Sequence, residues 1–198
     1  MYFCIGNVSY RERIMTSIET IVSEAVATLR AGGTILYPTD TIWGIGCNAA
    51  DAAAVDSIYA VKQRDHSKSM LMLADCKEWS VANGERPTTY ILPRELWEPL
   101  LGTSIADNIP AADGSLGIRV PNHHFCREII RRLGAPIVST SANLSGHQSP
   151  GCYAEIEEEL KDRVDFCVPP LAEFASNETR GSRILKVCPD GRQTVIRP

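Results

Sequence analysis

Apolar residues recur at helical spacing over residues 17–31, so that isoleucine, valine, alanine and leucine side chains share one stripe. This pattern predicts an amphipathic helix, with a capping box at Thr16 and Glu19 and a glycine pair at its end. Residues 34–37 follow as a short apolar run that ends before a proline, which predicts a buried strand.

A second helical pattern covers residues 51–63, and its inward stripe ends on Lys62. The apolar run at residues 69–73 predicts another strand. Residues 75–114 contain several prolines, two tryptophans and only weak periodicity, so the sequence assigns no element there.

Clean alternation of apolar and polar positions returns over residues 115–120. It places Ser115, Gly117 and Arg119 on one face of a predicted strand. Residues 123–133 then predict a helix whose inward positions are apolar and whose end is marked by a glycine.

The last third of the chain contains more strand signals than helix signals. Residues 135–138 predict a strand that leads into a polar run at residues 139–143, and residues 155–161 predict an acidic surface helix. Two strand patterns, residues 182–188 and 192–197, flank a Pro-Asp-Gly turn, which predicts a hairpin.

Such a hairpin pairs its far ends, so Ser182 and Arg197 are expected to lie close together. Strands that alternate with helices predict an α/β protein, and the hairpin makes its sheet mixed rather than purely parallel. The length fits a single domain over residues 1–198.

Composition narrows the class of protein. Hydrophobic residues make up 44% of the chain and charged residues 22%, which excludes disorder as the main state. The net charge of −4 argues against a generic basic nucleic-acid binder. Seven scattered cysteines without a C-x-x-C motif fit free thiols in a reducing cytoplasm, and neither a signal peptide nor a membrane span is expected.

Three cations, Lys62, Arg64 and Lys68, fall within seven residues at the end of the second predicted helix. A cation on an inward stripe is costly unless it meets an anion, and such a group suits a polyphosphate or a carboxylate. The alternative is a helix C-terminus, which favours cations because of its dipole. Arg119, taken alone, fits a solvated surface arginine.

Two polar segments follow predicted strands, at residues 37–46 and 139–149. Their hydroxyls and amide can bind ribose or phosphate oxygens at strand ends, although an ordinary turn or capping loop has the same composition. The chain contains neither a G-x-S-x-G motif nor a P-loop. Its four histidines lack metal-ligand spacing, so no structural metal site is expected.

Taken together, these segments resemble the YrdC/Sua5 family, the L-threonylcarbamoyladenylate synthases. The resemblance rests on four blocks in order: G-T-I-L-Y-P-T-D-T with G-I-G at residues 33–46, K-Q-R at 62–64, G-I-R-V-P at 117–121, and S-T-S-A-N with S-G at 139–146. Each block alone is weak, but four in order across about residues 17–198 are specific. The resemblance is to the short bacterial type, without the extra C-terminal domain of longer members.

The resemblance implies a YrdC-like twisted mixed β-sheet flanked by helices, with a deep, positively charged concave cavity. It implies an enzyme, a nucleotidyltransferase that makes threonylcarbamoyl-AMP and pyrophosphate from L-threonine, bicarbonate or CO2, and ATP with Mg²⁺ on its phosphates. The product feeds t6A formation at position 37 of tRNA, so the implied partners are the proteins of t6A transfer and tRNA itself.

The resemblance also implies roles for individual residues, with Lys62 and Arg64 as catalytic groups. The residues implied to contact ATP are Lys62, Arg64, Lys68, Ser115, Ser141, Asn143, Ser149 and Arg197. The residues implied to contact L-threonine are Thr41, Arg119, Ser139 and Ser182, with Arg119 on the carboxylate. N-carboxythreonine would itself attack the α-phosphate, so no protein nucleophile is required and catalysis would rest on positioning and charge neutralisation.

The chain departs from the family pattern at two places. Asp65 follows Arg64 where the family usually has proline, and the family's S-T-I-V-D strand is Ser-Arg-Ile-Leu-Lys at residues 182–186.

Two other functions are alternatives to the synthase. One is that of a YciO-like paralogue without synthase activity, which the intact Ser-Ala-Asn element disfavours. The other is a binding module for tRNA or double-stranded RNA, which the acidic net charge disfavours.

Overall fold

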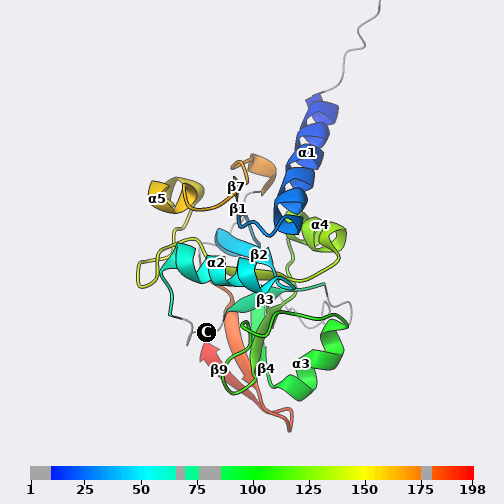
Figure 1. The fold of residues 1–198 in the computed structure, drawn as a ribbon, viewed down its shortest axis with the longest axis vertical. Coiled ribbons are helices and arrows are strands. Elements are labelled where there is room, and N and C mark those ends of the chain that lie inside the picture. The colour runs from blue at the N-terminus through cyan, green and yellow to red at the C-terminus, as the bar shows by residue number, and fades with distance from the viewer. Residues whose placement is uncertain (1–9, 66–69, 76–85, 175–179) are drawn as a thin grey trace, which may run out of the picture.

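A computed structural model of the chain describes residues 10–65, 70–75, 86–174 and 180–198 (Figure 1). Its strands are β1 (Ile35–Tyr37), β2 (Gly44–Asn48), β3 (Leu71–Leu73), β4 (Thr88–Leu92), β5 (Leu116–Arg119), β6 (Ile137–Ser141), β7 (Phe166–Cys167), β8 (Arg183–Val187) and β9 (Gln193–Arg197). They form one sheet in the order β7-β1-β2-β6-β3-β5-β4-β8-β9. The sheet is mixed, as predicted, because β1 pairs antiparallel with β2 and β3 pairs parallel with β5.

The α-helices are α1 (Tyr10–Arg30), α2 (Ala52–Lys62), α3 (Arg94–Leu101), α4 (His124–Leu133) and α5 (Glu158–Lys161). Two 3₁₀ turns, η1 (Tyr153–Glu155) and η2 (Ala172–Phe174), complete the described elements. Apolar side chains of α1 and α4 share one core cluster, and those of α2 and α3 share a second. The two clusters lie on opposite faces of the sheet, because neighbouring residues along β1 and β6 alternate between them.

The alternation of side chains along each strand decides what each face carries. In β1, Leu36 packs in the cluster of α2, whereas its neighbours Ile35 and Tyr37 pack with α1 and α4. In β6, Val138 faces the α2 side, so Ser139 and Ser141 face the other side. The face of the sheet that packs against α1 and α4 therefore also carries polar side chains, such as those of Ser139 and Ser141 toward the end of β6.

The capping residues of α2 fix where the helix begins and ends, and so where the residues after Lys62 lie. The Asp51 carboxylate accepts a hydrogen bond of 3.1 Å from the Ala54 amide and caps the first turn. The helix stops at Gln63, which takes a left-handed conformation with φ of 50°. The helix predicted over residues 51–63 is confirmed, and so is the inward position of Lys62, which is 1% exposed.

Three sequence predictions differ from the structure. The first helix begins at Tyr10, so Thr16 lies inside it and the predicted capping box is wrong. The helix extends before its apolar stripe because the preceding residues include arginine and glutamate, which favour helices. The acidic helix expected over residues 155–161 is only η1 followed by the single turn of α5. The unassigned stretch at residues 75–114 holds β4 and α3. No helix in the described part of the chain has the length and apolarity to cross a membrane.

Candidate functional site

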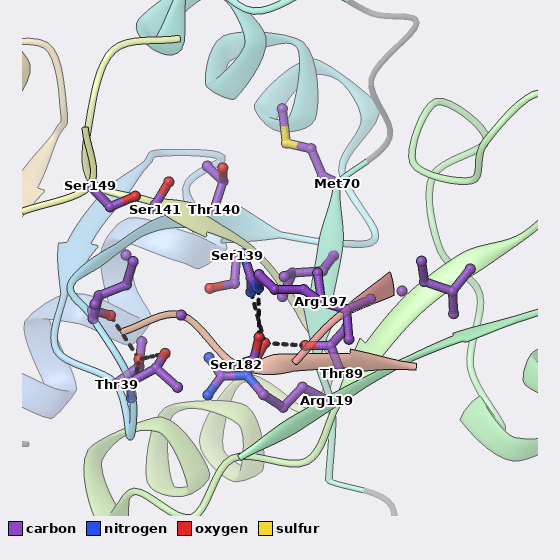
Figure 2. Close-up of a pocket in the computed structure, with 18 of the residues that line it drawn as sticks. Thr39, Met70, Thr89, Arg119, Ser139, Thr140, Ser141, Ser149, Ser182 and Arg197 are labelled. Atoms are coloured by element: carbon purple, nitrogen blue, oxygen red, sulfur yellow. Dashed lines mark hydrogen bonds between the residues drawn. The ribbon is translucent and has the colours of Figure 1, made fainter. Parts of the chain in front are cut away.

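A cavity of about 540 Å³ opens over the polar face of the sheet (Figure 2). Residues from seven of the nine strands described above, β2 to β6, β8 and β9, contribute to its lining together with the loop that follows β1. Gly117 lies in its floor, where an added Cβ would come within 3.3 Å of the Leu71 Cβ. The predicted face shared by Ser115, Gly117 and Arg119 is confirmed, because all three line the cavity.

The cavity brings together nine of the twelve predicted site residues. They are Thr41, Arg64, Ser115, Arg119, Ser139, Ser141, Ser149, Ser182 and Arg197. Lys62 and Asn143 are buried and do not line the cavity. Lys68 lies outside the described residues, so its predicted contact with ATP stays a prediction.

Four cations line the cavity, Arg64, Arg119, Lys186 and Arg197, and the described lining contains no aspartate or glutamate. Partial desolvation lowers the pKa of Arg197, and repulsion from the nearby Arg119 and Arg86 lowers this pKa further. A bound anion would relieve that repulsion. The lining is therefore suited to an anionic ligand with several oxygen atoms.

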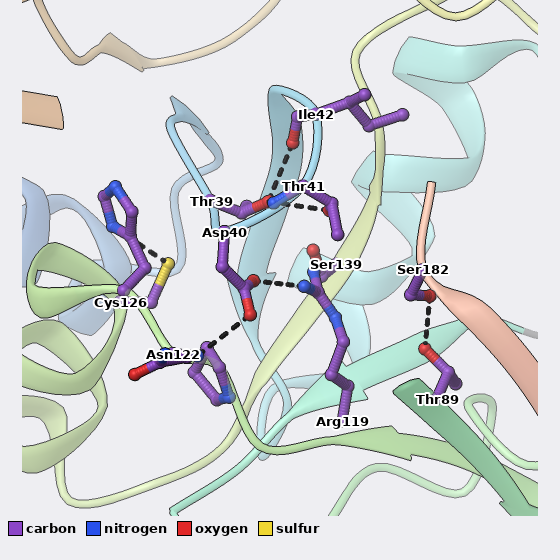
Figure 3. Close-up of polar contacts among 12 residues, drawn as sticks. Thr39, Asp40, Thr41, Ile42, Thr89, Arg119, Asn122, Cys126, Ser139 and Ser182 are labelled. Atoms are coloured by element: carbon purple, nitrogen blue, oxygen red, sulfur yellow. Dashed lines mark hydrogen bonds and ion pairs between the residues drawn. The ribbon is translucent and has the colours of Figure 1, made fainter. Parts of the chain in front are cut away.

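Arg119 is the most deeply buried of these cations, with 4% of its surface exposed. Its Nη1 donates to the Asp40 carboxylate, and the second oxygen of Asp40 accepts a hydrogen bond of 2.9 Å from the Asn122 amide (Figure 3). The Nε of Arg119 is buried and has no partner among the described residues. Arg119 is thus not a solvated surface arginine, and it retains donor capacity beyond the ion pair.

Hydroxyl groups next to Arg119 are fixed by buried partners. The Tyr37 hydroxyl donates to the Ser139 Oγ over 2.8 Å, and burial raises the pKa of Tyr37, so this phenol stays a neutral donor. The Thr39 Oγ1 accepts a hydrogen bond of 3.0 Å from the Thr41 amide and also contacts the Thr41 hydroxyl (Figure 3). Both networks preorganise oxygen atoms at the cavity wall.

The opposite wall is formed by the terminal hairpin. The Arg197 Nε donates to the Ser182 carbonyl oxygen over 2.8 Å, which confirms the predicted proximity of these two residues. The Ser182 hydroxyl lies 2.7 Å from the Thr89 hydroxyl on β4. A Cβ at Gly181 would approach the Arg197 guanidinium to 2.8 Å, so this glycine lets the guanidinium lie close against the backbone.

Lys62 and Arg64 are separated by one residue, yet they reach different environments. The left-handed backbone of Gln63 turns the chain between them. Arg64 lines the cavity, whereas the Lys62 ammonium donates to the backbone carbonyls of Ser141 and Asn143. Burial, and to a smaller degree the charge of Arg64, lowers the pKa of Lys62 to about 8.

Sequence reasoning missed several residues at the site. Asp40 stood inside a recognised block, but its role depends on Arg119, which is 79 positions away. Thr89 lies in residues 75–114, to which the sequence assigns no element, although Thr-Thr-Tyr-Ile is typical of a strand. Lys186 lines the cavity and pairs with Asp113 at 3.5 Å. Its spacing of four residues from Ser182, which directly precedes β8, is a signal that could have found it.

Metal-ligating side chains do not gather anywhere in the described residues, where no group of three or more His, Cys, Asp or Glu could hold an ion. The five described cysteines are free thiols. The cavity lining offers hydroxyl oxygens without a carboxylate. These residues do not fit a resident divalent cation, which normally requires carboxylate ligands.

The protein has an α/β fold whose mixed β-sheet carries a cavity lined by hydroxyl groups and cationic side chains. Such a cavity suits anionic small molecules with many oxygen atoms. The Sua5/YciO/YrdC family model, described as "Telomere recombination", matches residues 27–198. The chain belongs to this family.

Similar proteins from distant organisms carry one name. The threonylcarbamoyl-AMP synthase of Stenotrophomonas maltophilia is 33% identical over 164 residues, which cover 74% of this chain and 84% of that protein. The threonylcarbamoyl-AMP synthase of Mus musculus is 33% identical over 187 residues, which cover 88% of this chain and 65% of that protein.

Solved structures share the fold. Sua5 of P. abyssi, complexed with L-threonine, matches with a TM-score of 0.70 at 23% identity, over 91% of this chain and 54% of that one. YciO of E. coli matches with a TM-score of 0.68 at 22% identity, over 91% of this chain and 89% of that one. The YrdC-like mixed sheet flanked by helices is thereby confirmed.

Proposed function

We propose that this chain is an L-threonylcarbamoyladenylate synthase, which makes threonylcarbamoyl-AMP and pyrophosphate from L-threonine, bicarbonate or CO2, and ATP. The relatives named for this activity support the proposal. The structural observation that carries it is a single cavity lined by nine of the twelve residues implied for the two substrates.

The threonine subsite is proposed at Thr41, Arg119, Ser139 and Ser182. Arg119 lines the cavity, and within the described part of the chain its ion pair with Asp40 uses only Nη1, which supports its pairing with the threonine carboxylate. The hydroxyls of Ser139 and Ser182 are held by Tyr37 and Thr89, so they can present oxygens to the substrate without reorganisation.

The nucleotide subsite is proposed along the remaining lining, at Arg64, Ser115, Ser141, Ser149 and Arg197. Arg64 and Arg197 would neutralise phosphate charge, which supports the predicted positive character of the cavity. Lys68 is proposed as a further phosphate contact, and Asn143 would act through its side-chain oxygen, which accepts from the Ser149 hydroxyl over 3.3 Å. Magnesium would enter on the phosphates of ATP, because the lining has no ligand set of its own for it.

The proposed chemistry requires little from the protein beyond placement. The threonine amine adds to CO2 and releases a proton to solvent, which gives a carbamate. A carbamate oxygen then bonds to the α-phosphorus as the bond from this phosphorus to the bridging oxygen of the β-phosphate breaks, and pyrophosphate leaves. No lining residue has to form a covalent bond in this sequence. The four lining cations would hold the reacting anions together and stabilise the charge on the leaving pyrophosphate. A cytoplasmic location, the proteins of t6A transfer and tRNA stay predictions that follow from this activity.

The test is pyrophosphate release from ATP with magnesium and bicarbonate, with and without L-threonine, and with L-serine and L-alanine as controls. We expect release that requires threonine and is absent with alanine. Arg119→Met should weaken threonine affinity at least about tenfold in calorimetry, because a charge-assisted contact is lost. Arg183→Met, an exposed arginine on β8 outside the lining, is the matched control.

Two results would redirect the proposal. No threonine-dependent release from folded protein would favour a YciO-like or RNA-binding function, and steeply salt-dependent tRNA binding would identify the latter. Unchanged threonine affinity in Arg119→Met would remove Arg119 from the threonine subsite.

A further inference from the structure

Lys62 is a buried cation without an anionic partner. It is 1% exposed, and no carboxylate forms an ion pair with it among the residues that the structure describes. A charge in this position is costly unless strong hydrogen bonds compensate it. Its lowered pKa shows that part of the cost remains.

The compensation comes from the last residue of β6 and the loop that follows it, a segment that we call the 141–149 loop. The Lys62 ammonium donates to the Ser141 carbonyl and, over 2.7 Å, to the Asn143 carbonyl. The backbone carbonyl of Lys62 accepts a hydrogen bond of 3.0 Å from the Ser145 amide. The last residue of α2 thus binds the loop through both its side chain and its backbone.

The 141–149 loop supplies two hydroxyls to the cavity. Ser141 and Ser149 line it, and the Ser149 hydroxyl is tied to the side chain of Asn143. The Asn143 side-chain amide in turn donates to the carbonyls of Leu144 and His147, over 2.8 and 2.9 Å. Fixing the backbone at residues 141 and 143 therefore fixes both hydroxyls.

The direction of the two carbonyls also matters for an anionic ligand. A carbonyl oxygen carries partial negative charge and would repel phosphate oxygens. Because the carbonyls of Ser141 and Asn143 are directed at Lys62, which does not line the cavity, their negative ends are kept away from the ligand. The left-handed Gln63 makes this arrangement compatible with Arg64 in the cavity wall.

We propose that Lys62 is a positioning residue, which shapes the nucleotide subsite by holding the 141–149 loop from beneath instead of contacting phosphate. This inference rests on the proposed function for the identity of the ligand. Arg64 contacts the ligand, and Lys62 determines the shape of the wall on which the ligand lies.

The test compares Lys62→Met with Arg64→Met, which removes the same charge from the cavity wall. Hydrogen exchange is measured on the nucleotide-free protein at the amides of Ala142, Asn143 and Ser145. We expect about tenfold faster exchange in Lys62→Met and close to wild-type exchange in Arg64→Met, since the Lys62 ammonium donates the hydrogen bonds to the Ser141 and Asn143 carbonyls. Lys62→Gln, which keeps an uncharged N–H donor group, should fall between wild type and Lys62→Met, and it carries the test if Lys62→Met does not fold.

Calorimetry with ATP, ADP and AMP gives a second readout. Loss of loop shape should weaken all three ligands by a similar factor in Lys62→Met, whereas Arg64→Met should lose most with ATP. Wild-type exchange in both Lys62 variants, with a loss of affinity that grows with the number of phosphates, would overturn the proposal and make Lys62 a direct phosphate contact. Neither measurement needs turnover, so a failure of the proposed synthase activity is recognised separately.

Discussion

Replacement of Asp40 by alanine is expected to destabilise the fold strongly, because Arg119 would lose its ion-pair partner beside the cavity. The side chains of Arg119 and Asp40 are only 4% and 7% exposed, so water screens neither charge. Removing one partner of a buried pair costs about 3–5 kcal/mol. The Asn122 amide would also lose its acceptor, which adds about 1 kcal/mol. We therefore expect the free energy of unfolding at neutral pH to fall by about 4–6 kcal/mol.

Urea denaturation followed by tryptophan fluorescence measures this loss. The matched control is Asp190→Ala, which removes an exposed ion pair with Arg192 in the terminal hairpin and should leave the urea midpoint unchanged. A double variant, Asp40→Leu with Arg119→Met, removes both charges and should recover most of the stability lost in Asp40→Ala. Together the three variants separate an unpaired buried charge from a simple loss of packing.

L-Threonine adds a further readout that depends on the proposed function. If the threonine carboxylate pairs with Arg119, it should raise the urea midpoint more in Asp40→Ala than in the wild type, because it supplies the missing partner. A wild-type midpoint for Asp40→Ala without ligand would refute the account of a buried, unscreened pair. A double variant as unstable as Asp40→Ala would show that the loss does not come from the unpaired arginine.

The sequence predicted the parts of the site that depend on local periodicity. Strict alternation placed Ser115, Gly117 and Arg119 on one face, and helical spacing placed Lys62 inside. Both predictions are confirmed because the direction of a side chain follows directly from the repeat of a regular strand or helix. The hairpin likewise brought Ser182 to Arg197, since a turn fixes which residues pair.

Contacts between distant segments could not be predicted in this way. The strands do not follow one another in the sheet in their sequence order. The sequence around Asp40 therefore gives no signal that its loop lies beside Arg119 at the end of β5. The helix α3 was missed for another reason. It begins after Pro93 and contains Pro99, so its local signals resemble those of a loop although Trp97 anchors it in the core.

The K-Q-R block shows the limit of spacing arguments. Two cations two residues apart were predicted to act on the same ligand. The left-handed conformation of Gln63 separates them, and neither composition nor periodicity reveals that a glutamine takes this conformation. Short motifs locate a site well, but the role of each member depends on backbone angles that only the structure supplies.

Two further predictions concern the scaffold around the site. Gly46→Ala should destabilise the fold by about 2–3 kcal/mol, since its Cβ would lie 2.2 Å from the Val138 backbone carbonyl oxygen. Gly151→Ala is the control. Equal urea midpoints for the two variants would contradict this close packing at Gly46. Hydrogen bonds from Arg131 and its neighbouring arginine lower the pKa of Glu128 from 4.5 to about 2. The folded protein therefore keeps this carboxylate charged while the unfolded chain protonates, and the stability it contributes above pH 4.5 is lost as the pH falls toward 2. Glu128→Gln should flatten the fall of the urea midpoint between pH 4.5 and pH 2, and an unchanged slope would show that this network does not carry the acid sensitivity.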